Sequence, residues 1–320
     1  MDEIEHKYVQ ANGLKLHVAE IGSESSPVVV FLHGFPEIWY SWRHQMIAVA
    51  KAGFRAMAPD YRGYGLSDPP PQPEKTTFLD LISDLLAILD ALNISKACDP
   101  LVFLVSKDFG SAVVSIFVLL HQERVSGFVT LGVPFRPPRL PTHHKLLPEG
   151  FYISRWQEPG RAEADFGRLD AKTVVRNIYI MFSRSEIPIA QENQEIMDIV
   201  EPSTPLPSWF SEEDLATYGA LYQKSGFQTA LQVPYRAFLD RKNELNIPIP
   251  KVEVPALLIM GEKDYVFKFP GIEDYTRNGE VKKFVPKLDI IYIPEGTHFV
   301  QEQFPDHVNE LILNFLTGHS

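Results

Sequence analysis

The sequence predicts an α/β protein in which helices cover both faces of a mostly parallel sheet. Short apolar runs of the kind that form buried strands alternate with segments of helical periodicity, and this alternation is typical of parallel sheets. A long central stretch then carries helical patterns without strand patterns, before two more strand patterns follow. The strand patterns fall at 28–32, 54–59, 101–105, 127–131, 256–260 and 289–293.

The other elements follow from local patterns in chain order. Residues 8–10 and 14–18 alternate around Asn12-Gly13, which predicts a β-hairpin with a tight turn. Apolar residues recur at helical spacing over 78–92, so this segment should be an amphipathic helix with one face on the sheet. Further helical patterns lie at 39–51, 111–120, 161–166, 173–182, 212–225 and 305–316.

The central helical stretch is expected to form an inserted lid. Prolines cluster after Gly132, and Pro248 and Pro250 precede the return of the strand patterns. Since the helical stretch interrupts a regular alternation of strands and helices, we assign it to a separate layer. The expected division is a core of residues 1–135 and 248–320 with a helical lid, or cap, of residues 136–247.

Composition and charge exclude several kinds of partner. The 320 residues carry a formal net charge of -11, which argues against a surface for nucleic acid or anionic membranes. The single cysteine, Cys98, cannot form an internal disulfide, and this suits a reducing compartment. The longest apolar run, at 112–120, is too short to span a bilayer, and the acidic N-terminus lacks an apolar signal core. We therefore expect a cytoplasmic protein without a membrane span.

The residues around Asp108 have the features of a turn that presents a reactive side chain. A strand pattern at 101–105 leads into a nearly all-apolar helical pattern at 111–120, so the chain must turn sharply between them. Small residues, Ser106 and Gly110, stand two positions to either side of Asp108, as a nucleophile elbow requires. An aspartate that only caps the following helix would fit the same residues.

Two further candidates follow later strands. In open parallel sheets, ligands bind beyond the carboxyl ends of the strands. Asp264 follows the strand pattern at 256–260, and His298 follows the last strand pattern. Together with Asp108 they occur in the order nucleophile, acid and base, which is the order in hydrolases with a nucleophile elbow. Glu262 competes with Asp264 for the place of the acid, and the Gly-x-x-Asp spacing favours Asp264.

Several motifs together give the chain a family resemblance. They are His33-Gly34-Phe35-Pro36-Glu37, Asp60-Tyr61-Arg62-Gly63-Tyr64-Gly65-Leu66-Ser67, the Asp108 turn, Phe151-Tyr152-Ile153-Ser154-Arg155-Trp156-Gln157 and Gly296-Thr297-His298. With these motifs the chain resembles the soluble epoxide hydrolases of plants over about residues 8–316. Each motif is shared with many α/β hydrolases, but the aspartate elbow combined with the lid segment is specific. The resemblance implies the α/β-hydrolase fold, with a mostly parallel eight-stranded sheet.

The resemblance also implies a role for each candidate residue. Asp108 would be the nucleophile, and Asp264 with His298 would be the charge-relay pair. Tyr152 and Tyr235 fall where the family has the lid tyrosines that donate hydrogen bonds to the epoxide oxygen. Without the family, neither could be chosen over the other tyrosines of the lid. The implied reaction converts a small apolar epoxide, of the fatty-acid or aryl type, and water to a vicinal diol.

These residue types suit the implied chemistry. An epoxide is a strained ether without a carbonyl, so the Asp108 carboxylate can open it directly and form an alkyl-enzyme ester. His298 would then take a proton from the water that hydrolyses this ester. The oxyanion formed in that step needs donors, and we assign the backbone N–H groups of Phe35 and Phe109. One such donor contributes about 3 kcal/mol.

Three neighbouring residues are expected to support the site. Pro36 shapes the loop after an early strand, and the sequence leaves open whether the Phe35-Pro36 bond is cis. Glu37 is expected near the base or its water, although a solvated loop glutamate fits equally. Lys107 stands where the family usually has His. A cation beside Asp108 would weaken the carboxylate as a nucleophile, so we expect Lys107 to point away and to pair with another carboxylate.

Other functions remain open from the sequence. A haloalkane or haloacid dehalogenase uses the same Asp and His on the same fold. Phe109 argues against the first, because it lacks the indole N–H that a leaving halide needs, and the helix over 109–122 has no Arg or Lys for a substrate carboxylate. No Gly-x-Ser-x-Gly occurs, which disfavours a serine esterase. A non-catalytic protein of the same fold that binds a small ligand is kept as an alternative because of Lys107.

The sequence predicts neither a metal site nor a cofactor. The His143-His144 pair has no nearby Cys or clustered carboxylates that would complete a metal site. The assembly is expected to be a monomer or a homodimer.

Overall fold

Eight strands form the central sheet of the protein. The computed structural model describes residues 3–94, 102–137, 147–237 and 251–319, and within them the strand order is β1-β2-β4-β3-β5-β6-β7-β8. β1 pairs antiparallel with β2, and β2 with β4, whereas all later pairings are parallel. The expected mostly parallel sheet is thus confirmed. The strands are β1 (Glu5–Ala11), β2 (Leu14–Ile21), β3 (Val28–Leu32), β4 (Arg55–Pro59), β5 (Val102–Lys107), β6 (Val125–Leu131), β7 (Ala256–Gly261) and β8 (Leu288–Ile293).

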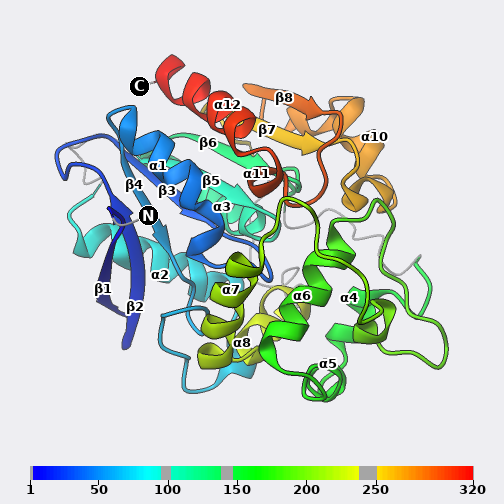
Figure 1. The fold of residues 1–320 in the computed structure, drawn as a ribbon. Helices are drawn as coiled ribbons and strands as arrows, with labels where there is room; N and C mark the ends of the chain where they lie inside the picture. Colours follow the sequence, from blue (N-terminus) through cyan, green and yellow to red (C-terminus); the bar gives the residue numbers. More distant parts are fainter. Residues whose placement is uncertain (1–2, 95–101, 138–146, 238–250, 320) are drawn as a thin grey trace.

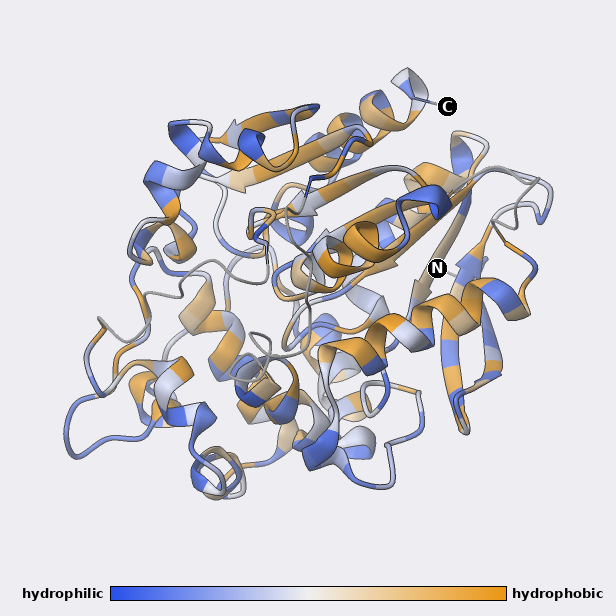
Figure 2. Cartoon of the chain, turned by 180° about the vertical axis from the view of Figure 1, so that it is seen from behind, coloured by the Kyte–Doolittle hydropathy of each residue, from blue (hydrophilic) through white to orange (hydrophobic). Residues whose placement is uncertain are grey.

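Helices cover both faces of this sheet. α1 (Arg43–Lys51) packs with α12 (Pro305–Gly318) on one face, and α2 (Phe78–Ala91) packs with α3 (Gly110–Leu120) on the other (Figure 1). Seen from behind, the strands are largely hydrophobic, and the helices around them carry hydrophobic and hydrophilic stripes (Figure 2). β3 and β5 are buried along their whole length, because they lie in the middle of the sheet under helices on both sides.

A separate layer of helices lies beside the sheet, between β6 and β7 in the chain (Figure 1). Its described residues contain no strand, and a single isolated bridge joins Phe151 to Ile189. The expected lid limits at 136 and 247 stay a prediction, since residues 138–146 and 238–250 lie outside the described residues. The helices are α4 (Tyr152–Gln157), α5 (Arg161–Phe166), α6 (Ala171–Phe182), α7 (Glu212–Ser225) and α8 (Gln228–Ala230).

Short helical segments complete the chain. The helix expected at 39–51 is divided into a 3-10 turn and α1, and α10 and α11 were not expected. α11 has only four residues, and α10 has a single buried apolar side chain, Ile272, so neither shows an apolar stripe in the sequence. The short segments are η1 (Trp39–Trp42), η2 (Pro73–Lys75), η3 (Gln122–Arg124), η5 (Ile196–Ile199), η6 (Leu231–Arg236), η8 (Tyr265–Lys268), α10 (Ile272–Arg277), η9 (Glu280–Lys283) and α11 (Val300–Gln303).

Side-chain caps fix the starts of two long helices. At α2, Thr77 Oγ1 accepts from the Asp80 backbone N–H at 3.3 Å, and the Asp80 carboxylate accepts from the Thr77 N–H at 2.8 Å. Ser211 and Asp214 form the same reciprocal pair at α7. Each pair satisfies backbone donors that a helix start leaves free, which explains why the starts fall where the sequence predicts them.

The turn between β5 and α3 is tight and closely packed. Asp108 has a φ of 51°, in the left-handed region that non-glycine residues rarely adopt. A Cβ atom on Gly110 would lie 2.6 Å from the carbonyl oxygens of Leu32 and His33, so this turn packs directly on the end of β3. The Ser106 hydroxyl donates to the Val129 carbonyl at 3.2 Å. The turn is therefore the nucleophile elbow that the small flanking residues predict.

Gly110→Ala should destabilise the fold, because its new methyl group would overlap two backbone oxygens that cannot move away. We expect the free energy of unfolding to fall by about 1–3 kcal/mol, as for other overpacked sites. Urea denaturation measures this change. Gly318→Ala is the matched control, since no atom lies within 4 Å of its Cβ position. Equal stability of the two variants would contradict the close approach.

Candidate active site

Three expected site residues meet at the carboxyl ends of the parallel strands. Asp108 follows β5, Asp264 follows β7 and His298 follows β8. His298 Nδ1 lies 3.1 Å from both carboxylate oxygens of Asp264, and His298 Nε2 lies 3.8 Å from Asp108 Oδ1. The structure thus places the imidazole between the two carboxylates. Asp264 is within hydrogen-bond distance of Nδ1, whereas Nε2 faces Asp108 without a hydrogen bond among the described residues.

The Asp108 carboxylate is held on its second oxygen. Asp108 Oδ2 accepts a hydrogen bond from the Phe35 backbone N–H at 3.2 Å, while Oδ1 faces His298. The side chain of Asp108 is 21% exposed, whereas those of Asp264 and His298 are fully buried. No hydrogen bond from the Phe109 N–H is found within the described residues, so its place in the oxyanion hole stays a prediction.

Asp264 rather than Glu262 contacts the histidine. Asp264 Oδ1 also accepts from the Val266 N–H at 3.0 Å, which fixes the carboxylate at the start of η8. Glu262 instead pairs with Arg277 at 3.1 Å near the surface. Glu262 and Asp264 lie in a turn closed by the hydrogen bond from the Asp264 N–H to the Gly261 carbonyl, and only Asp264 reaches the imidazole.

The lid supplies both expected tyrosines. Tyr152 begins α4, and Tyr235 lies in η6, whose backbone leaves the helical conformation at Val233 (φ −117°, ψ 113°). Burial raises the pKa of each phenol well above its ordinary value, and the Asp108 charge adds to both rises. Both phenols therefore keep their protons at neutral pH and can act as donors.

A third tyrosine, Tyr265, was not expected from the sequence. It directly follows Asp264, and its hydroxyl lies 3.1 Å from the hydroxyl of Tyr152. Burial also raises the pKa of Tyr265 well above its ordinary value, with the neighbouring Tyr152 adding to the rise. The only signal in the sequence was its position beside a candidate acid. Its hydroxyl can orient the Tyr152 proton.

Aromatic side chains surround this group. Phe182 of α6 lies 5.1 Å from the Tyr152 ring and 5.8 Å from the His298 ring, measured between centroids. Trp156 packs 4.9 Å from Tyr235, and Phe35 packs 5.6 Å from the same ring. These contacts make the space between core and lid largely apolar, so the polar groups just described stand in a low-dielectric surrounding.

Glu37 is a buried member of the site. Its Oε2 accepts from the Gly34 N–H at 3.1 Å, and its Oε1 accepts from the Gln301 amide. Burial raises its pKa from the ordinary 4.5 to about 8, and the Lys107 charge opposes that rise. The solvated alternative for Glu37 is therefore wrong. The adjoining Phe35–Pro36 peptide bond is cis, which answers the question that the sequence left open.

Lys107 differs from the expectation in one respect. It makes no ion pair with Asp108, as expected, but within the described residues it pairs with no other carboxylate either. The side chain is fully buried, and its Nζ lies 5.5 Å from the centroid of the Phe299 ring. The expected pairing with another carboxylate is therefore wrong for the described residues.

A second buried charged cluster joins core and lid, and no pattern in the sequence indicated it. Glu302 of α11 pairs with Arg43 Nη1 at 2.6 Å and accepts from the Tyr179 hydroxyl at 2.9 Å. Arg43 also pairs with Asp214 of α7 at 2.9 Å. Burial raises the pKa of Glu302, and Arg43 opposes the rise. These contacts fix the lid helices over the loop that carries His298.

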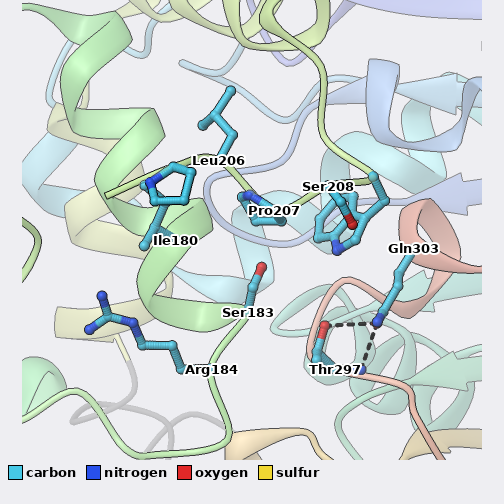
Figure 3. Close-up of a pocket in the computed structure, with 10 residues that line it drawn as sticks. Ile180, Ser183, Arg184, Leu206, Pro207, Ser208, Thr297 and Gln303 are labelled. Carbon is cyan, nitrogen blue, oxygen red and sulfur yellow. Dashed lines mark hydrogen bonds between the residues drawn. The ribbon is translucent and has the colours of Figure 1, made fainter. Parts of the chain in front are cut away.

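A surface groove of about 320 Å³ borders the same loop (Figure 3). Thr297, directly before His298, lines it, and the Thr297 N–H and hydroxyl both donate to Gln303 Oε1 at 2.8 Å. The other walls come from the end of α6 and from a lid loop at 205–209. His143 and His144, the pair weighed for a metal site, lie outside the described residues.

Within the described residues, no helix is both long and apolar enough to cross a bilayer.

The fold and the aspartate elbow define the class of protein: it is an α/β hydrolase with a carboxylate where many of its class have serine. The family model described as alpha/beta hydrolase fold matches residues 27–305.

Full-length relatives narrow the family. "Epoxide hydrolase 3" of Siraitia grosvenorii is 38% identical over 324 aligned residues, which cover 99% of each chain. "Epoxide hydrolase A" of Mycobacterium tuberculosis is 33% identical and covers 98% of this chain and 97% of its own. The crystal structure of an epoxide hydrolase from Vigna radiata is 36% identical, with a TM-score of 0.88 over 99% of each chain. The chain belongs to the epoxide hydrolase family of the α/β-hydrolase fold.

Glu37→Gln should remove a pH dependence of stability. Because burial raises the pKa of Glu37 from 4.5 to about 8, the folded protein holds a proton there that the unfolded chain has lost between these pH values. The free energy of unfolding of the wild type should therefore fall, relative to Glu37→Gln, as pH rises from 5 to 8, by at most about 1.4 kcal/mol per unit. Above about pH 8 the difference should level off.

Urea denaturation of both proteins at several pH values measures this difference. Glu262→Gln, which removes a carboxylate near the surface, serves as the control and should not reproduce the effect. A difference between wild type and Glu37→Gln that stays constant or grows with pH would contradict the burial of an ionisable Glu37.

Proposed function

We propose that the protein hydrolyses epoxides to vicinal diols through an ester on Asp108. The observation that carries this proposal is that the two oxygens of the Asp108 carboxylate have different surroundings. Oδ2 is held by the Phe35 N–H at 3.2 Å, and Oδ1 is left facing the apolar space and His298. An oxygen that is fixed but little hydrogen-bonded in a water-poor site is a good nucleophile toward a saturated carbon.

In the first step, Asp108 Oδ1 bonds to one epoxide carbon and the ring C–O bond breaks. The electron pair of that bond stays on the epoxide oxygen, which becomes an alkoxide and needs a proton. Tyr152 and Tyr235 are the buried phenols that can donate it, since burial keeps both protonated. Tyr265 orients the first of them through the 3.1 Å contact of their hydroxyls.

In the second step, water attacks the carboxyl carbon of the Asp108 ester. His298 Nε2 takes one proton of the water, and Asp264 stabilises the imidazolium through Nδ1, 3.1 Å away. The carbonyl oxygen of the ester, Oδ2, becomes an oxyanion beside the Phe35 N–H. When it collapses, the bond between the carboxyl carbon and Oδ1 breaks, and the leaving oxygen takes the proton held by His298. The second proton of the water returns to the tyrosinate, so the diol leaves and one oxygen from water stays in the Asp108 carboxylate.

The substrate class follows from the walls. Phe35, Trp156 and Phe182 pack against one another and against the two tyrosines, so the surroundings of the reacting groups suit an apolar epoxide of the fatty-acid or aryl type. We also propose that the protein works in the cytoplasm, since a single cysteine in 320 residues suits a reducing compartment, and as a monomer or homodimer.

A dehalogenase is the competing function. The Phe109 ring packs 5.5 Å from Tyr61 and 6.1 Å from Tyr64, so this position offers an aromatic surface and no N–H to a halide. Diol formation from an aryl epoxide, without halide release from a bromoalkane, separates the two reactions. A non-catalytic ligand-binding protein would give neither product.

His298→Gln should trap the covalent intermediate. Ring opening needs Asp108 and the tyrosines, whereas ester hydrolysis needs the base, so the variant should gain the mass of one epoxide per chain and turn over only once. Intact-protein mass spectrometry after mixing with an aryl epoxide measures the adduct. Asp108→Asn should show no adduct within the first turnover, and Asp274→Asn, an exposed carboxylate in α10, should behave as the wild type.

Oxygen isotope labelling can contradict the two-step mechanism. A single turnover in heavy-oxygen water should place the label first in Asp108 and only on later turnovers in the diol. Label that enters the diol in the first turnover would mean direct attack by water, and the two-step proposal would then be wrong.

The tyrosines should affect only ring opening. Tyr152→Phe or Tyr235→Phe should each slow formation of the adduct by about 100-fold or more, since general acid catalysis contributes at least that much. Tyr265→Phe removes one indirect hydrogen bond and should cost only about 2- to 12-fold, from about 0.5–1.5 kcal/mol. Rapid-mixing fluorescence of the first turnover measures these rates.

Tyr275→Phe is the matched control, because that hydroxyl donates to the Phe135 carbonyl at 3.0 Å and contacts none of the three site tyrosines. Equal rates for Tyr152→Phe and Tyr275→Phe would remove Tyr152 from the proposed mechanism.

A further inference from the structure

Lys107 is the buried side chain that the proposed chemistry does not use. It ends β5, directly before the nucleophile, and is fully buried. Its Nζ has no hydrogen-bond partner within the described residues and contacts the Phe299 ring. An ammonium group loses strong hydration on burial, so a site that contains it needs compensating negative charge close by.

That compensating charge lies on the residues of the active site. A Cβ atom on Gly132 would lie 3.1 Å from Asp264 Oδ2, 3.3 Å from Lys107 Nζ and 3.7 Å from His298 Nδ1, so these three atoms surround the same glycine. Similarly, a Cβ atom on Gly34 would lie 2.7 Å from Glu37 Oε2 and 2.9 Å from Asp108 Oδ2. Three carboxylates thus lie around the end of β5.

Among the described residues, Lys107 is the cation whose charge lowers the pKa of Glu37. The other nearby cation, Arg43, is taken up by Glu302 and Asp214. The other titratable groups that are electrostatically coupled to Glu37 are carboxylates and phenols. They lie on the elbow, on α11, in the loop after β4 and in the lid. They are Asp108, Glu302, Tyr61, Tyr179, Tyr218 and Tyr222.

Glu37 is connected to the nucleophile Asp108 by hydrogen bonds to two adjacent backbone amides. Glu37 Oε2 accepts from the Gly34 N–H at 3.1 Å, and the next amide along the chain, Phe35 N–H, donates to Asp108 Oδ2 at 3.2 Å. An ionised carboxylate is a stronger acceptor than a neutral carboxyl group. Glu37 in its charged form therefore fixes the loop that aims the Phe35 N–H.

We propose that Lys107 is a positioning residue whose buried charge favours the ionised form of Glu37, in which Glu37 holds the Gly34–Phe35 amides toward the Asp108 oxyanion. This inference rests on the proposed function, which assigns the Phe35 N–H to the ester-hydrolysis step. Lys107 touches neither substrate nor reacting atoms in this account. Without it, three carboxylates would share one buried region with only the transient imidazolium as a counter-charge.

The direction of the effect follows from the two opposing influences on Glu37. Burial raises its pKa to about 8, and the Lys107 charge lowers it from a still higher value. The hydrolysis step should therefore speed up as Glu37 ionises, with a midpoint near pH 8. In Lys107→Met, which keeps the stem but loses the charge, that midpoint should move to higher pH. At pH 7 each unit of movement slows hydrolysis about tenfold.

The test measures the decay of the Asp108 ester against pH in single turnovers of an aryl epoxide. Lys107→Met and Lys107→Gln should both shift the midpoint upward, and Lys107→Arg, which keeps the charge, should leave it near the wild-type value. Ring opening, measured in the same traces, should change less than hydrolysis does. In a Glu37→Gln background, Lys107→Met should produce no further shift, because the group through which it acts is gone.

Infrared difference spectra, each variant against its Glu37→Gln counterpart, measure the protonated carboxyl of Glu37 directly and need no turnover. An unchanged or lowered midpoint in the folded neutral variants would overturn the inference, as would an equal shift in the Glu37→Gln background. If the wild type converts no epoxide while the infrared midpoint shifts as expected, the proposed function fails and the Lys107–Glu37 coupling stands.

Discussion

The close approach of two loops at the end of the sheet is the constraint on which the site depends. Gly34 and Gly110 allow the loop after β3 and the elbow after β5 to meet, since a Cβ on either would overlap the opposite loop. Only at this distance can the Phe35 N–H reach Asp108 Oδ2 at 3.2 Å. The left-handed φ of Asp108 is the strain that this contact requires, and the buried strands on either side hold it in place.

Burial then determines what the polar groups around the elbow can do. The lid covers them with aromatic side chains, so phenols stay protonated as donors while the Glu37 carboxyl is pushed toward its neutral form. The cluster of Arg43, Glu302 and Tyr179 fixes the lid over the same loop that carries His298. Core and lid therefore form one electrostatic unit, in which the proposed role of Lys107 is to balance charge that solvent cannot reach.

The strands and helices of the core could be predicted closely from the sequence, whereas the contacts within the site could be predicted only in part. The strand at 28–32 and the helices at 161–166 and 212–225 have the expected bounds, because apolar runs and helix starts are local properties of the sequence. Short α10 and α11 carry no such pattern. Tyr265, Gln301 and Glu302 were missed, because their importance comes from partners far away in the chain. The family resemblance, and no pattern in the residues, singled out Tyr152 and Tyr235.

The sequence by itself determined the parallel sheet, the elbow at Asp108 and the order of Asp108, Asp264 and His298, because turns and strand ends follow from small residues and apolar runs. Only the tertiary structure decided that Asp264 rather than Glu262 meets the imidazole and that Glu37 is buried with a pKa of about 8. It also placed Lys107 without a carboxylate partner among the described residues. Burial and pairing depend on which distant segments pack together, and a local pattern carries no record of that.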